Sequence, residues 1–154
     1  MRSAAGALAL LMAGQAAADP PVRHFAPPGP PPPGLPADAK APFSSAVLAG
    51  DTLYLSGVTD IDPATHQHGS SARESAKLVL DALKRSTEQA GYTMDDLVWV
   101  QVFTTDLSGF SDFGAVYAGY FHGPLPARSF IGVAGLMGGA HFEVNAIAAR
   151  KPTH

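Results

Sequence analysis

Prolines are concentrated near the N-terminus of this 154-residue chain, and they limit what that part of it can fold into. Ten of the 14 prolines lie between residues 19 and 42. Because proline lacks a backbone N–H donor, a segment so rich in it forms neither a helix nor a central strand. We expect an extended polyproline II linker over 19–42, with a docking ligand for an aromatic groove as the alternative. This leaves 43–150 as the folded domain.

The residues before this linker have the pattern of a secretory signal peptide. Arg2 precedes an apolar stretch at 4–12, and three alanines at 16–18 form a small-residue cleavage site before Asp19. The apolar stretch is too short to span a bilayer. The pattern predicts a signal peptide over 1–18 and a periplasmic or secreted protein. The alternative is a misassigned start codon and a cytoplasmic protein.

Composition excludes several classes of protein. The formal net charge is −3, from 10 basic and 13 acidic residues, which argues against a nucleic-acid-binding protein. The absence of cysteine excludes disulfides, thiolate catalysis and cysteine-based metal sites. Only 15% of the residues are charged, against a usual share of about 25%. We therefore expect part of the surface to be buried against another copy of the chain.

Hydrophobic periodicity over the domain predicts an α+β fold. The order of elements is β-β-α-β-α-β-β, with two helices packed on one face of a mixed sheet. Strands are expected at 45–48, 53–56, 97–105, 128–133 and 142–149, and helices at 71–90 and 110–121.

Local patterns place particular side chains within these elements. The tetrapeptide Ser-Ala-Arg-Glu at 71–74 has the spacing of a helix capping box, and Gly91 is expected to end the same helix. Strict alternation in the third strand places Val98, Val100 and Val102 on one face, toward that helix.

Arg128 is the first candidate functional residue. It opens an otherwise apolar strand, and its guanidinium can bind a carboxylate through two parallel hydrogen bonds. The alternative is a strand-end arginine in a surface ion pair.

Glu143 is the second candidate. Alternation places it with Asn145 and Ile147 on one face of the last strand, opposite Phe142 and Val144. A carboxylate there could position a water molecule or act as a base. The alternative is a solvated or ion-paired strand residue.

Seven segments of the domain follow one another in an order that is typical of one protein family. They are Pro42-Phe43-Ser44-Ser45-Ala46, Leu55-Ser56-Gly57, Asp62-Pro63-Ala64-Thr65, Val102-Phe103-Thr104-Thr105-Asp106-Leu107, residues 117–121, Pro126-Ala127-Arg128-Ser129 and Phe142-Glu143-Val144-Asn145-Ala146-Ile147-Ala148. With these segments, residues 42–149 resemble the Rid family, the reactive intermediate deaminases of the YjgF type.

The resemblance implies a chorismate-mutase-like fold and a homotrimer with ligand clefts between subunits. It also implies hydrolysis of reactive 2-imino or 2-enamino acids to 2-keto acids and ammonia, and places the family's substrate-binding arginine at Arg128 and its water-associated glutamate at Glu143. Such chemistry needs no metal or organic cofactor, because an imine is already electrophilic. The partners expected are a small 2-imino or 2-keto carboxylate and further copies of the chain, with no nucleic acid and no membrane span.

Other expected site residues line the substrate cleft. The resemblance places Ser56 and Gly57 at the cleft wall, where a glycine lets a ligand approach the backbone. Phe43, Gly114 and Phe130 stand where deaminase-active members commonly carry tyrosine, asparagine and cysteine. These departures favour the alternative function, a non-catalytic carboxylate-binding or protein-protecting module on the same scaffold. Arg128 and Glu143 favour the enzyme.

Overall fold

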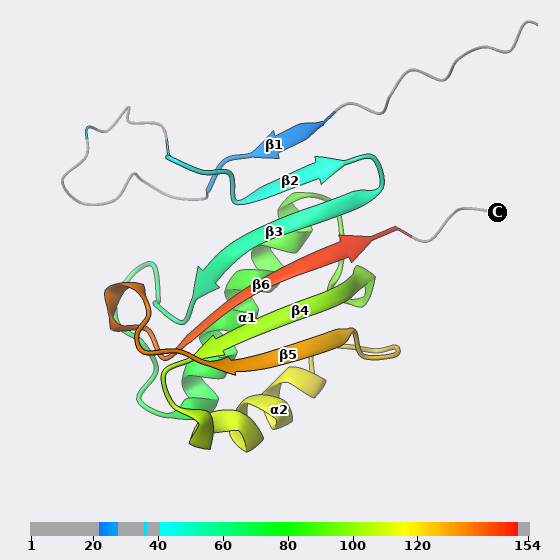
Figure 1. Cartoon of the computed structure of the whole chain (residues 1–154). Helices are drawn as coiled ribbons and strands as arrows, with labels where there is room; N and C mark the ends of the chain where they lie inside the picture. The colour runs from blue at the N-terminus through cyan, green and yellow to red at the C-terminus, as the bar shows by residue number, and fades with distance from the viewer. Residues whose placement is uncertain (1–21, 28–35, 37–40, 151–154) are drawn as a thin grey trace, which may run out of the picture.

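Two helices cover one face of a six-stranded sheet in the computed structural model of the protein, which describes residues 22–27, 36 and 41–150 (Figure 1). The strand order is β1-β2-β3-β6-β4-β5, and within the described residues β4 and β5 are the one parallel pair. This architecture confirms the expected α+β fold. The strands are β1 (Arg23–Phe25), β2 (Ala46–Ala49), β3 (Thr52–Thr59), β4 (Leu97–Thr104), β5 (Ala127–Gly132) and β6 (Phe142–Ala149), and the helices are α1 (Ala72–Gln89) and α2 (Phe110–Ala118).

Strand β1 lies inside the segment that was expected to be a linker. Residues 22–26 contain no proline, and β1 pairs antiparallel with β2 at the edge of the sheet. The backbone N–H and the hydroxyl of Ser45 both donate to the Phe25 carbonyl, at 2.8 and 3.1 Å. An edge strand needs only one partner, so five residues between prolines suffice. The expected signal peptide at 1–18, and the linker apart from residues 22–27, 36, 41 and 42, lie outside the described residues.

Helix α1 begins with a modified form of the expected capping box. The Ser71 hydroxyl accepts from the backbone N–H of Glu74 at 3.3 Å, as predicted. The Glu74 carboxylate, however, accepts from the backbone and hydroxyl of Ser70, one residue further from the helix than expected. At the other end Gly91 has φ +81°, a conformation that few other residues adopt.

The core lies between the helices and the sheet. Val100 and Val102 of β4 are fully buried there, but Val98 is 49% exposed. The pairing of β4 with β6 shifts by one residue between Leu97 and Trp99, and this irregularity turns Leu97 toward the core instead of Val98. The expectation that Val98 shares a face with Val100 was therefore wrong.

No helix of the described residues lies over the other face of the sheet (Figure 1). Register places Tyr54, Ile147 and Trp99 side by side across β3, β6 and β4. Phe103 lies between Glu143 and Ile131 in a second row. Within the described residues, no helix is long and apolar enough to cross a membrane.

Candidate functional site

Arg128 lies on β5, the edge strand next to α2 (Figure 1). Its register partner is Val100, which faces the helices, so the Arg128 side chain also points to the helix layer. There its guanidinium carbon lies 4.7 Å from the ring centre of Tyr117, 5.5 Å from that of Phe110 and 5.9 Å from that of Phe113. These distances are within the range of a cation–π interaction.

The guanidinium of Arg128 has no acidic partner in the described part of the chain. The ion pairs found there join other residues, and no hydrogen bond to the Arg128 side chain is found. A half-buried arginine held by rings keeps its N–H donors free for a carboxylate from outside the chain.

Tyr117 lies under this arginine and is nearly inaccessible, with 2% of its surface exposed. Its hydroxyl finds no hydrogen-bond partner among the described residues. Burial raises the pKa of Tyr117 to about 12, and the nearby positive charge of Arg128 opposes the shift. The phenol is therefore neutral at ordinary pH, and its ring is the part that contacts Arg128.

Glu143 lies on the face of the sheet that no helix covers. Its neighbours Phe142 and Val144 are buried on the helix side, so the alternation expected in this strand is confirmed. The carboxylate rests against Gly57, where an added Cβ would overlap Oε1 and lie 3.0 Å from Cδ. Gly57 belongs to an irregularity of β3, where the register with β6 shifts between Leu55 and Val58. The absence of a side chain at residue 57 thus makes room for Glu143.

Ser56 precedes Gly57 in β3 and is hydrogen-bonded to the segment that carries Phe43. The Ser56 hydroxyl donates to the Ser44 carbonyl at 2.7 Å and so ties the segment that carries Phe43 to β3. Phe43 is 57% exposed. The structure therefore joins Ser44 to Ser56 through this hydrogen bond, and the adjacent Gly57 to Glu143.

Phe130 belongs to a different group. Its ring makes edge-on contacts with Phe110 at 5.1 Å and Phe113 at 5.5 Å, so it packs beneath α2. Together with Arg128 it faces the helix layer, whereas Glu143 faces the opposite side of the sheet. Within a single chain the two principal candidates do not meet.

Sequence reasoning missed the aromatic residues around Arg128. Phe113 and Tyr117 stand four residues apart in the helix expected at 110–121, a spacing that indicates only a shared helix face. Periodicity identifies the buried face of a helix, but it carries no signal for a cation on a strand that reaches the same face.

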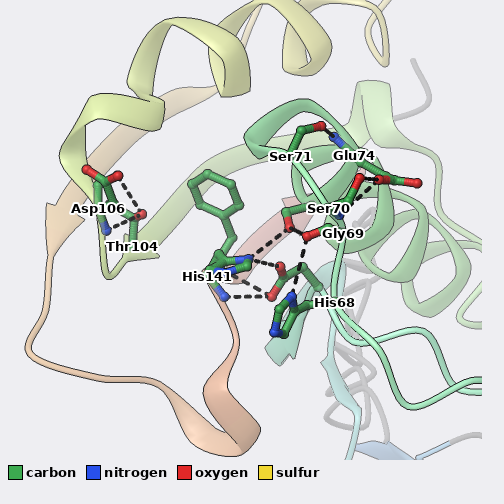
Figure 2. A network of polar contacts seen from close by, with 11 residues as sticks. His68, Gly69, Ser70, Ser71, Glu74, Thr104, Asp106 and His141 are labelled. Atoms are coloured by element: carbon green, nitrogen blue, oxygen red, sulfur yellow. Dashed lines mark hydrogen bonds and ion pairs between the residues drawn. The ribbon is translucent and has the colours of Figure 1, made fainter.

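A buried polar network near His141 was also missed (Figure 2). Asp60 is fully buried and accepts from the backbone N–H groups of His141 and Phe142, at 2.9 and 3.3 Å. The His141 ring nitrogen Nδ1 lies 3.3 Å from the second carboxylate oxygen of Asp60 and 3.1 Å from the Ser75 hydroxyl. These contacts join the end of β3 to the start of β6 and to α1.

A cavity of about 270 Å³ opens beside this network. It lies between the first turn of α1 and the residues before α2, near Ser70, Asp106 and His141 (Figure 2). Hydrogen bonds from Ser108 hold the pKa of Asp106 below its usual value. None of the expected site residues lines this cavity.

Comparison with known proteins agrees with this fold. Residues 35–150 match the sequence profile of the family described as Endoribonuclease L-PSP. The chain is 37% identical over 116 residues to the 2-iminobutanoate/2-iminopropanoate deaminase of Bos taurus, an alignment that covers 74% of this chain and 84% of the relative.

Two solved structures extend the comparison. A putative endoribonuclease of Thermotoga maritima superposes with a TM-score of 0.72 and 34% identity, covering 84% of this chain and 99% of the other. Escherichia coli TdcF with bound serine superposes with a TM-score of 0.69 and 30% identity, covering 73% of this chain and 91% of the other. The chain therefore belongs to the endoribonuclease L-PSP family, which includes the Rid and YjgF-type proteins that it was expected to resemble.

Proposed function

We propose that the protein is a hydrolytic deaminase that converts reactive 2-imino or 2-enamino acids to 2-keto acids and ammonia. The observation that carries this proposal is the guanidinium of Arg128, which lies over three rings and has no acidic partner among the described residues. Two relatives support it. The Bos taurus protein is named for 2-imino acid deamination, and the TdcF structure contains serine, a small carboxylate.

The chemistry asks little of the protein. Arg128 holds the substrate carboxylate. Glu143 accepts a proton from a water molecule while the oxygen of that water molecule attacks the imine carbon. The C–N bond of the resulting carbinolamine then breaks. The nitrogen leaves as ammonia with the protons of water, and a keto group remains. Holding the reactants together supplies most of the acceleration, because the imine is already electrophilic.

A second copy of the chain is needed to bring the two residues together. Arg128 and Glu143 face opposite sides of one sheet, but Arg128 lies on the edge strand β5. We infer a site in which Arg128 of one copy and Glu143 of another face the same ligand, within a homotrimer.

The direct test is release of 2-keto acid from freshly generated 2-iminopropionate and 2-iminobutyrate, with spontaneous hydrolysis subtracted. We expect Arg128→Ala to weaken binding of pyruvate by about 30- to 4,000-fold, the usual effect of removing one partner of a desolvated charge pair. Arg128→Lys should restore little of the pyruvate binding, because an ammonium does not reproduce the two parallel donors of a guanidinium. Wild-type binding of pyruvate by a folded Arg128→Ala protein would contradict the role of Arg128.

Mixing two inactive variants tests the shared site. Arg128→Ala and Glu143→Gln chains, unfolded together and reassembled, should regain activity, because some sites then contain both intact residues. No recovery in mixed assemblies, with each variant alone inactive, would place both residues of a site on one chain.

The alternative function is a carboxylate-binding or protein-protecting module without catalysis, favoured by Phe43, Gly114 and Phe130. Glu143→Gln separates the two functions. In an enzyme, turnover should fall by about 10²- to 10⁴-fold while pyruvate still binds. A wild-type protein that binds pyruvate but never accelerates imine hydrolysis would be the binding module.

A further inference from the structure

We propose, on the basis of the carboxylate-binding function above, that Phe110, Phe113 and Tyr117 of α2 form an aromatic cage that positions Arg128. The cage holds the positive charge through the ring faces and leaves the N–H donors for the ligand. These three are positioning residues, because their contacts are with Arg128.

The cage is a rigid part of the fold. Its rings come from one helix at spacings of three and four residues, so they line the same face. Phe113 is fully buried and Tyr117 nearly so, and their rings stack at 5.9 Å. Phe113 also packs against Phe142 at 5.1 Å. Rings fixed in this way hold a flexible arginine in one place, and a preorganised group loses less entropy when its ligand binds.

Rings suit a binding arginine better than an acidic partner does. A carboxylate would accept hydrogen bonds from the same N–H groups that a ligand needs and would compete with it. A cation–π contact attracts the charge without occupying any donor. The single acidic residue of α2, Asp112, pairs with Arg73 of α1 at 2.9 Å, and no ion pair joins it to Arg128 among the described residues.

Phe110 gives the most direct test because it is 52% exposed, so its replacement spares the core. We expect Phe110→Leu to weaken pyruvate binding by about twofold to fivefold, the effect of losing one exposed cation–π contact. The matched control is Leu107→Ala, which removes a 59% exposed apolar side chain outside the cage. Equal affinities in the two variants would overturn the proposal.

A carboxylate introduced beside Arg128 tests whether an acidic partner would compete with the ligand. Phe110→Glu places an acid beside Arg128, and Phe110→Gln is its uncharged match. We expect Phe110→Glu to bind pyruvate at least about tenfold more weakly than Phe110→Gln, because the acid occupies the arginine and repels the ligand. Equal binding by the two variants would overturn the proposal.

Two variants at residue 117 distinguish the contribution of the Tyr117 ring from that of its hydroxyl. Tyr117→Phe keeps the ring and should retain most of the affinity, whereas Tyr117→Leu should lose about tenfold or more, as expected for a desolvated contact. Loss of affinity in Tyr117→Phe as large as in Tyr117→Leu would assign the effect to the hydroxyl and overturn the cage.

A measurement without ligand keeps this inference separate from the proposed function. The rings should shift the NMR signals of the Arg128 side chain upfield in the wild type and in Tyr117→Phe, and less in Tyr117→Leu. Absence of that shift in the wild type overturns the cage. If the wild type shows the expected upfield shift but binds no 2-keto acid, the proposed function is overturned. The contact between the rings and Arg128 is then still supported.

Discussion

Glu143 depends on a residue that has no side chain. Its carboxylate occupies the space next to Gly57 that any Cβ would fill. The backbone of Gly57 is not among those with positive φ, so glycine is required here for space and not for conformation.

Gly57→Ala should therefore displace Glu143 without unfolding the protein, because the atom that must move is the end of a flexible side chain. We expect imine hydrolysis to fall by about 10- to 100-fold, since small misplacements of a catalytic group have effects of this size. Pyruvate binding at Arg128 should change little. Ketoacid release and pyruvate titration measure the two effects, and full turnover in Gly57→Ala would contradict this position of Glu143.

Tyr117 should make stability depend on pH in the alkaline range. Its pKa is raised from 10.0 to about 12 in the folded chain, so its contribution to stability is complete below pH 10 and is lost as pH rises toward 12. Relative to Tyr117→Phe, the wild type should lose up to about 1.4 kcal/mol of unfolding free energy per pH unit in this range.

The same variant has an expected effect at neutral pH. Because the buried hydroxyl has no hydrogen-bond partner among the described residues, Tyr117→Phe should be more stable than the wild type by about 1 kcal/mol at pH 7. Urea unfolding of both proteins from pH 7 to 11 measures both differences. A constant difference across that range would show that the phenol ionises equally in the folded and unfolded chains.

At the scale of elements, α2 is shorter than expected and too short to be stable on its own. It has nine residues, ends at Ala118, and was expected to continue to residue 121. Gly119 caps it, and Gly114 lies in its interior. Packing of Phe113 and Tyr117 against the sheet stabilises this helix more than its own propensity does.

Gly114→Ala should stabilise the protein. A Cβ at residue 114 would meet no atom within 4 Å, and alanine favours a helix interior over glycine by about 1 kcal/mol. The melting temperature should rise by about 4 °C. Thermal unfolding measures this change, and a fall in melting temperature would mean that the space beside residue 114 is occupied by another copy of the chain.

Across the whole molecule, the uncovered face of the sheet is the feature that favours assembly. It carries Trp99, Phe103 and Ile147, which are half-buried, and Tyr54, which is 51% exposed. The pair Gln101 and Asn145 lies between Trp99 and Phe103 on this face, so the apolar side chains stand in two rows. Exposed apolar side chains on a sheet face are typical of an interface.

We propose that this face packs against further copies in a homotrimer. Light scattering on the full chain should give three times the mass of one chain at micromolar concentration. Phe103→Lys should lower that mass, because it places a charge within the interface, whereas Leu107→Lys on the helix side should not. A monomeric wild type would remove the shared site together with the trimer.

Sequence alone determined the order of the elements in the domain and which side chains of β6 face the core. Both follow from local periodicity, because a strand alternates its side chains and a helix repeats them every three to four residues. The same alternation placed Glu143 opposite Phe142, and the strand β6 at 142–149 agrees with its predicted bounds. The short strand β1 escaped prediction because the prolines around it dominate the local signal.

Tertiary structure alone decided which of these residues meet. Arg128 lies over α2 because parallel pairing of β4 and β5 sets its register with Val100, and periodicity within one strand does not report the register between two. The one-residue shift in β4 that exposes Val98 and the burial of Asp60 beneath His141 likewise depend on contacts between segments far apart in the chain. Side-chain identity thus fixed what chemistry was available, and long-range pairing determined where each group points, because contacts between distant segments leave no periodic trace in the sequence.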